Sequence, residues 1–373
     1  MPPKKKQNTS VAKSNIGASS VAASDGKPPP RNVFKGLLAM PVELLRLIST
    51  FFGSPVEVPM GHLTNSADPA LPWSYYDLPD GLRALSQTCH LLRLTFLPML
   101  WESMDVCVQA RTGKPAAFYK HLGDSLQRIS AGLSHEPELL TYIRTVNVIL
   151  TRYSTYEILP VFAGTMTKMP NLHTLQIIHA HTAMTTHLKN GFAGISLPNV
   201  QQLILPSWAH EILRCCPEVR HVICTADDGG KLVSAIAKCC KKVEILEGFH
   251  FDDEKVRKRI IKATPNLTAV HFNNVTKPDT IKSLAVFKKL NAIRLYNLTS
   301  QEALESGAYH TLPEDLQQCI NAARVVLSKQ PNTKHLSIRH TVEWHHNRYG
   351  PNAVVDLRGR TERSAVLEEI DVT

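Results

Sequence analysis

Histidine and cysteine are the residue types in this sequence whose spacing could support metal or redox chemistry. Four histidines lie close together near the C-terminus, namely His335, His340, His345 and His346. Zinc needs ligands that converge on one point, and these four fall on mixed strand and loop segments with no cysteine beside them. We therefore interpret them as surface or strand-face residues, and we expect no bound metal and no other cofactor.

Two vicinal cysteine pairs, Cys215-Cys216 and Cys239-Cys240, are the other candidates for chemistry. None of the eight cysteines forms a Cys-x-x-Cys motif, and each pair falls at the end of a predicted helix. Packing as small apolar residues explains such positions better than ligation or redox chemistry. Because the basic N-terminus is not followed by an apolar stretch, it is not a secretory signal. Reduced thiols in the cytoplasm or the nucleus are expected.

Catalytic motifs are missing from the sequence. It has no phosphate-binding Gly-x-x-x-x-Gly-Lys-Ser/Thr loop, no Gly-x-Ser-x-Gly elbow and no His-Glu-x-x-His pair. No run of about 18 apolar residues occurs, which excludes a membrane-spanning helix. The sequence therefore favours a protein that is not an enzyme and that works by binding.

The charge distribution bears on the class of partner. The chain has 373 residues and a formal net charge of +10. Half of that excess lies in residues 1–32, which are rich in Ser, Ala, Lys and Pro and are predicted to be a disordered basic tail. The remainder is only mildly basic, so binding of nucleic acid is not expected. The Lys4-Lys5-Lys6 run is interpreted as a solvated basic end, with nuclear import as the alternative.

A repeated pattern organises residues 140–373. Its core is apolar-x-x-apolar-x-apolar, often preceded by Pro-Asn, as in Pro170-Asn171-Leu172 followed by Leu175 and Ile177. The first apolar position recurs at residues 143, 172, 200, 219, 243, 267, 290, 333 and 367. Most separations lie near the roughly 20–29 residues of a leucine-rich repeat. Helical patterns between the copies, such as the Asp252-Asp253-Glu254 start signal, predict a strand–helix stack.

Residues 33–106 precede this array and are predicted to form a small helical unit. Met40-Pro41-Val42-Glu43 opens the first helix, because Pro suits the first turn and Glu43 meets the positive end of the helix dipole. A Pro-rich loop is predicted over residues 54–77. A second helix begins near Pro79, with Leu82, Leu85, Cys89 and Leu92 on one face, and a third runs from Phe96 to Trp101.

The helical unit resembles an F-box. The resemblance rests on Met40-Pro41-Val42-Glu43-Leu44-Leu45 with Ile48, then on the run from Leu82 to Arg93 with its Ser86-x-x-Cys89 spacing, and on the closing Leu100-Trp101. The chain departs from the family in its long 54–77 loop, which a surface position tolerates at small entropic cost. The repeats also lack the Asn that usually follows the last apolar position, so no buried Asn ladder is expected.

The resemblance, which is to F-box proteins with degenerate leucine-rich repeats of fungal type, implies a fold and a function. The fold is α/β: a short helical unit followed by an irregular leucine-rich-repeat-like solenoid, with parallel strands and helices on the convex side. The chain would be a substrate receptor of a Skp–cullin–F-box ubiquitin ligase. Partners would be the Skp adaptor, the cullin scaffold and an unidentified protein target for ubiquitination. Docking on the adaptor is assigned to Met40, Pro41, Leu44, Leu45, Ile48, Leu85, Leu92 and Trp101.

The target-binding face is predicted from strand alternation. With Leu175 and Ile177 inward, their neighbours point outward. The same positions along the array give Gln176, Gln202, His221, Glu247, Phe249, His271, Asn273, Arg294, Tyr296, His335 and Arg339. This mixture of apolar, aromatic and basic side chains suits a protein partner. Two alternatives stay open, namely a solvated strand face without a ligand and a protein-interaction scaffold that has no ligase role.

Overall fold

The computed structural model describes residues 40–50, 77–107, 115–307, 312–330, 333–342 and 365–372. The predicted tail (1–32), nearly all of the predicted 54–77 loop, and His345 and His346 lie outside these ranges. Residues Val42–Thr373 form one compact unit. None of the helices in the described ranges is both long and apolar enough to cross a lipid bilayer.

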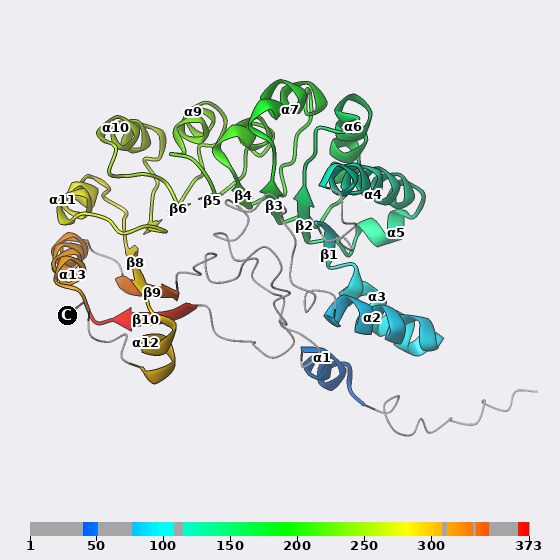
Figure 1. Cartoon of the computed structure of the whole chain (residues 1–373), viewed down its shortest axis with the longest axis horizontal. Coiled ribbons are helices and arrows are strands. Elements are labelled where there is room, and N and C mark those ends of the chain that lie inside the picture. The colour runs from blue at the N-terminus through cyan, green and yellow to red at the C-terminus, as the bar shows by residue number, and fades with distance from the viewer. Residues whose placement is uncertain are drawn as a thin grey trace, which may run out of the picture. The chain divides into compact units, whose positions relative to one another are not determined.

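One sheet runs through the described part of this unit, and its strands follow one another in sequence order (Figure 1). Each strand from β1 to β9 is parallel to the next, whereas β10 is antiparallel to β9. The strands are β1 (Ser103–Val106), β2 (Thr145–Ile149), β3 (Thr174–His179), β4 (Gln202–Leu205), β5 (His221–Cys224), β6 (Ile245–Glu247), β7 (Ala269–His271), β8 (Ala292–Thr299), β9 (His335–Val342) and β10 (Ala365–Ile370).

Helices connect the parallel strands, and most of them line the convex side of the curved sheet, whereas α12 lies apart from this row (Figure 1). A parallel pair requires such a crossover, because the chain must return to the edge where it started. The α-helices of the array are α4 (Pro115–His135), α5 (Pro137–Leu140), α6 (Thr155–Met166), α7 (Thr185–Gly191), α8 (His210–Leu213), α9 (Gly230–Cys239), α10 (Glu254–Ala263), α11 (Pro278–Ser283), α12 (Gln301–Ser306) and α13 (Glu314–Ser328), with 3-10 turns at 182–184, 207–209 and 284–286.

The hydrophobic core fills the layer between the sheet and these helices. Inward-facing residues at matched positions on consecutive strands form a continuous row, each at most 1% exposed: Val146, Leu175, Leu203, Val222, Leu246, Val270, Ile293 and Leu336. Burying one such side chain is worth about 1.5–3 kcal/mol. A single strand–helix unit has no such cover on its flanks, so each unit is stabilised by its neighbours.

The α/β class and the parallel array were predicted correctly from the sequence, but the last strand differs. The repeat pattern at Leu367, Ile370 and Val372 implied one more parallel strand, whereas β10 pairs antiparallel with β9. Antiparallel neighbours need no helical crossover. The array also begins before the first recognisable repeat, since β1 at Ser103 already pairs with β2.

Three helices precede the sheet: α1 (Val42–Thr50), α2 (Asp77–Thr88) and α3 (His90–Leu100). Contacts join α1 to α2 and α2 to α3. The predicted single helical face through Cys89 is wrong, because Cys89 has extended backbone (φ −156°) and caps α3. Leu82 and Leu85 therefore belong to α2, and Leu92 belongs to α3.

The predicted helix start at 252–254 is confirmed. Asp253 is the N-cap of α10, and its carboxylate accepts hydrogen bonds from the backbone N–H groups of Lys255 and Val256. These two bonds lower the pKa of Asp253, because they stabilise the ionised carboxylate. Residues 313–315 likewise begin α13, with Pro313 at its N-cap.

Candidate functional site

The outward side of the sheet, which is the face turned away from the hydrophobic core and the helices, carries polar side chains at matched strand positions. On β1 to β3 this row consists of Asp105, Asn147 and Gln176, and on β6 to β8 it consists of Glu247, His271 and Arg294. At the first end the side chains are joined by ordinary hydrogen bonds: Asp105 Oδ1 accepts from Asn147 Nδ2 at 2.7 Å and from Ser103 Oγ at 2.7 Å. The second end consists of ionisable groups.

Glu247 is the centre of that ionisable group. It is the last residue of β6 and is only 4% exposed. Its Oε2 atom lies 3.2 Å from His271 Nδ1 and 3.7 Å from His221 Nε2, and its Oε1 atom lies 3.7 Å from Arg339 Nη1. Burial alone would raise the pKa of Glu247, but the imidazoles of His221 and His271 outweigh it and hold this pKa below its usual range. Glu247 is thus a buried carboxylate.

His271 is partly buried beside this carboxylate, and its own pKa is lowered. Burial is the main cause, and the nearby guanidinium of Arg294 adds to it, while Glu247 opposes both. The ring of His271 lies edge-on to that of His221, with centroids 6.1 Å apart. At neutral pH the site therefore combines a carboxylate with a neutral imidazole. Both groups can accept hydrogen bonds, and both can serve as ligands to a cation.

Local backbone geometry fixes where Glu247 points. The next residue, Gly248, has φ +74°, and a Cβ atom there would come within 2.2 Å of the carbonyl oxygen of Cys224. The N–H of Gly248 donates to the carbonyl of His271. Only glycine fits this turn, because an L-residue would be strained and would also clash with the neighbouring unit.

Most residues predicted for the target-binding face lie on the outward side but are not open to solvent. Among the eleven, only His335 is exposed. The partly buried ones are Gln176, Gln202, His221, His271, Asn273, Arg294, Tyr296 and Arg339, and the buried ones are Glu247 and Phe249. The structure brings His221, Glu247, His271 and Arg339 together. Whether any of these residues binds a target stays a prediction.

Phe249 does not lie on the outward face. It follows the Gly248 turn, so strand alternation no longer applies to it, and its side chain joins the hydrophobic core. A Cβ at Gly229 would come within 2.5 Å of its ring. Phe249 therefore packs between units, which corrects its expected position.

His340 is not on the surface either. It is fully buried on β9, between Asn297 on β8 and Glu368 on β10. Asn297 Nδ2 donates to His340 Nδ1 (3.0 Å), which leaves the proton of the ring on Nε2, 2.9 Å from Glu368 Oε2. The histidine thus links the antiparallel strand β10 to the parallel array, a structural role.

The vicinal cysteines are packed as expected from the sequence. Cys215, Cys216 and Cys240 are buried, and no disulfide involves them. Burial raises the pKa of Cys215 to about 11 and that of Cys240 to about 12, so both thiols are protonated at neutral pH. The Sγ atom of Cys240 contacts the carbonyl oxygens of Leu213 and Cys216, each at 3.4 Å, which joins neighbouring units.

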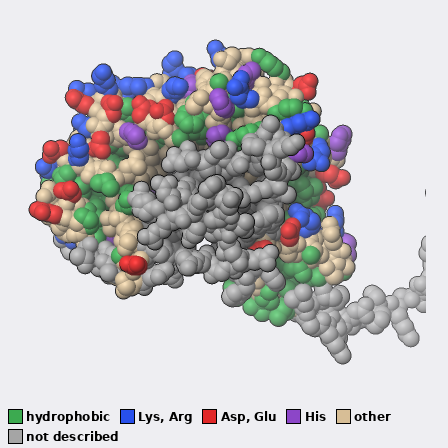
Figure 2. Space-filling model, in the orientation of Figure 1, with side chains coloured by type: hydrophobic (Ala, Val, Ile, Leu, Met, Phe, Trp, Pro, Cys, Tyr) green, Lys and Arg blue, Asp and Glu red, His purple; other side chains and the backbone are tan. Residues whose placement is uncertain are grey.

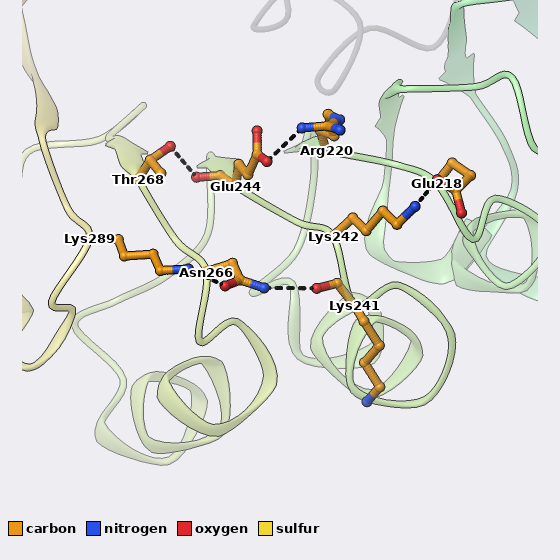
Figure 3. Close-up of polar contacts among 8 residues, drawn as sticks. All are labelled: Glu218, Arg220, Lys241, Lys242, Glu244, Asn266, Thr268 and Lys289. Atoms are coloured by element: carbon orange, nitrogen blue, oxygen red, sulfur yellow. Dashed lines mark hydrogen bonds and ion pairs between the residues drawn. The ribbon is translucent and has the colours of Figure 1, made fainter.

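The Pro-Asn dipeptides have a role that the sequence did not reveal. At the edge where the strands begin, the side-chain amides of Asn171, Asn199 and Asn266 each donate to a backbone carbonyl of an earlier segment, at Thr141, Pro170 and Lys241 respectively. Each asparagine lies three residues before its strand. Lys289 occupies this position before β8, and it binds Asn266 (Figure 3). We call these side-chain bonds the edge ladder. It lies at the surface, unlike the buried Asn ladder of regular leucine-rich repeats, which was not expected from the sequence.

The predicted docking residues divide between surface and interior. Met40, Pro41 and Leu44 are exposed, Ile48, Leu85 and Trp101 are partly buried, and Leu45 and Leu92 are buried. On α1, Leu44 is 46% exposed and Leu47 is 55% exposed, and on α3 Leu94 is 62% exposed. Figure 2 shows hydrophobic side chains gathered over α1. Leu47 and Leu94 were not identified from the sequence, although both lie within the F-box-like segment.

Comparisons with known proteins leave the family open. No protein-family model matches this chain, and no curated protein matches it in sequence.

Proposed function

We propose that this protein is a non-catalytic substrate receptor of a Skp–cullin–F-box ubiquitin ligase. In this proposal the helices α1 to α3 form an F-box-like unit that docks on the Skp adaptor. The strand–helix array behind them is a leucine-rich-repeat-like solenoid, whose outward strand face binds a protein target. The observation that carries the proposal is the set of apolar side chains that α1 exposes within the F-box-like motif.

α1 is too short to be stable alone, and it uses only part of its apolar surface inside this chain. Isolated helices shorter than about 12 residues are marginal in water. Leu45 and Ser49 are buried, whereas Val42, Leu44 and Leu47 are exposed. Exposing several large apolar residues on one short helix is typical of an interaction site. A partner that covers Leu44 and Leu47 would bury the side chains that this chain leaves in water.

The division between surface and interior refines the predicted docking set. Leu45 and Leu92 lie in the interior, so in this proposal they position the helices. Leu44 on α1 remains a docking residue, and the exposed Leu47 joins it. Leu91 and Leu94 on α3 extend the exposed apolar surface of the helical unit. The array contributes the other half of the proposal, a set of stacked units with an extended face, which is a common way to hold a protein partner.

Co-purification with the Skp adaptor tests this proposal. The test variant is the full chain with Leu44→Ala and Leu47→Ala, both exposed, so folding should be preserved. Its matched control carries Val161→Ala on α6 and Val325→Ala on α13, which are exposed apolar residues of the array. Burying each leucine in an interface is worth about 1.5 kcal/mol or more, so losing both should weaken binding at least about tenfold.

The outcomes separate the alternatives. We expect the wild type and the control to retain the adaptor and the double variant to lose it. Failure of the wild type to bind the adaptor, or equal binding by all three proteins, would overturn the ligase proposal. Capture of a target by the wild type without any adaptor would instead support the alternative, a scaffold that uses only its array.

A further inference from the structure

The trio His221, Glu247 and His271 presents metal-ligand atoms from three consecutive parallel strands. Glu247 and His271 are direct cross-strand partners on β6 and β7. His221 on β5 is paired with Ile245, so it reaches Glu247 diagonally across the sheet. Rigid, hydrogen-bonded strands thus position all three side chains, and the Gly248 turn fixes the end of β6.

The three ligand atoms are close enough to share one ion. His221, Glu247 and His271 each offer one ligand atom, and these three atoms all lie within 4.8 Å of one another. Two of the separations are 3.2 and 3.7 Å. In a tetrahedral site with metal–ligand bonds of about 2.0–2.1 Å, ligand atoms lie roughly 3.3–3.4 Å apart. The observed separations therefore bracket the value that coordination requires.

One atom of the trio is incompletely satisfied among the described residues. His221 Nε2 is buried and has no hydrogen-bond partner there, since Glu247 Oε2 at 3.7 Å is too far for one. A buried nitrogen without a partner costs about 1–3 kcal/mol. A cation bound between this nitrogen and the carboxylate would use its lone pair.

Glu247 also has a contact outside the trio that orients its carboxylate. The second carboxylate oxygen, Oε1, faces Arg339 at 3.7 Å. That ion pair leaves Oε2 turned toward the two histidines, and outer contacts of this kind orient ligands in metal sites.

We propose that His221, Glu247 and His271 form a zinc-binding site on the outward face of the sheet. Two imidazoles and one carboxylate match the preference of Zn²⁺, whereas Ca²⁺ and Mg²⁺ prefer oxygen ligands alone. Three protein ligands leave the fourth tetrahedral position for water or for a side chain of a bound protein. This site is independent of the docking surface on α1 and does not rest on the ligase proposal.

Zinc titration of the full chain tests the site. The purified protein is stripped with a chelator, dialysed and titrated with ZnCl₂ against a chromophoric zinc chelator. His221→Ala and His271→Gln are the test variants, and His173→Ala and His335→Ala are controls, because these two histidines lie near strand starts and are exposed. We expect tight stoichiometric binding by the wild type and the controls, and a loss of more than about 100-fold in affinity for each test variant.

Two further measurements keep the outcome clear. Zinc should raise the Tm of the wild type but not that of the test variants, because a ligand that binds only the folded state stabilises it; this comparison also detects a variant that fails to fold. Co²⁺ in place of zinc should give the absorption of a four-coordinate site without a thiolate charge-transfer band. Equal zinc affinity in wild type and test variants, or a thiolate band from the cysteines, would overturn the proposal.

Discussion

At the edge where the parallel strands begin, the same asparagine hydrogen bond recurs in several units. On the outward face of the same strands, the side chains differ from one unit to the next. Asn171, Asn199 and Asn266 all bind a carbonyl of an earlier unit from the same position before a strand. On the face, Glu247 is followed at the matched positions by His271 and Arg294. The repeated positions join neighbouring units, whereas the side chains on the outward face change in charge and chemistry from one unit to the next.

The two ends of the outward face also differ in how each surrounds its carboxylate. Asp105 is satisfied by neutral donors, Asn147 and Ser103, within hydrogen-bond distance. Glu247 instead faces two imidazoles and a guanidinium, and two of these contacts, those with His221 and Arg339 at 3.7 Å, are too long for a hydrogen bond. A carboxylate surrounded by neutral donors needs nothing more, whereas a buried ionic cluster can be completed by a further ligand.

The largest loss of stability is expected at Gly248, because its backbone turn ends β6 and fixes the direction of Glu247. Gly248→Ala places a Cβ atom against the Cys224 carbonyl oxygen at positive φ, so we expect a loss of at least about 3 kcal/mol in the free energy of unfolding. Gly194→Ala is the matched control, because Gly194 also has φ +74° but a Cβ there has no neighbour within 4 Å. It should lose only about 1–2 kcal/mol. Urea unfolding of both variants measures the difference, and equal losses would show that the contact with Cys224 does not matter.

An intermediate effect is expected from the pH dependence of the Glu247 cluster. Both Glu247 and His271 have lower pKa values in the folded protein than their ordinary values of 4.5 and 6.5. As pH falls through those ordinary values, the unfolded chain takes up protons that the folded chain does not. Stability should therefore decrease as pH falls below 6.5 because of His271, and further below 4.5 because of Glu247.

Glu247→Gln should remove the second, more acidic part of this decrease. Denaturant unfolding is measured at about pH 7, 5.5 and 4 with a chelator present, so that no metal contributes. At neutral pH the variant should be less stable by about 1–3 kcal/mol, because buried donors lose a charged partner. Glu254→Gln is the control, since Glu254 pairs with Lys258 at the surface. A Glu247→Gln profile parallel to that of the wild type would contradict the assigned role of the carboxylate.

The sequence was sufficient to predict the elements that depend on local signals. Asp253 marks the helix start at α10, and the apolar repeat identifies the inward row. β1 and α4 were missed because residues 103–135 lack the Pro-Asn repeat pattern. The break at Cys89 was missed because the apolar spacing continues across it, although the backbone there is extended.

The candidate site could not be predicted from the sequence, because it depends on how the neighbouring strands are aligned in the sheet. His221, Glu247 and His271 come from different strands, and none of them lies in a recognisable ligand motif. They were correctly assigned to the outward face by alternation, but their convergence depends on Glu247 pairing directly with His271 and on the diagonal reach of His221. Phe249 was misplaced for a different reason, since strand alternation ends at the Gly248 turn.

The smallest effect is expected at the repeated edge. Asn199→Ala removes one exposed hydrogen bond from Asn199 Nδ2 to the carbonyl of Pro170, so we expect a loss of about 1 kcal/mol or less in the free energy of unfolding. Asn190→Ala is the control, because Asn190 is exposed on α7 and its side chain has no such bond among the described residues. Urea unfolding compares the two variants.

Removing two asparagines of the edge ladder together tests whether the edge and the outward face are independent of each other. Asn171 and Asn266 act at junctions between units that are far apart along the array, so their losses should add to within about 0.5 kcal/mol when both are replaced by alanine. Such a double variant should retain its zinc affinity, because neither amide reaches the Glu247 cluster. A loss of zinc binding in the double variant would mean that the edge also positions the face, and the two rows could then no longer be treated as separate.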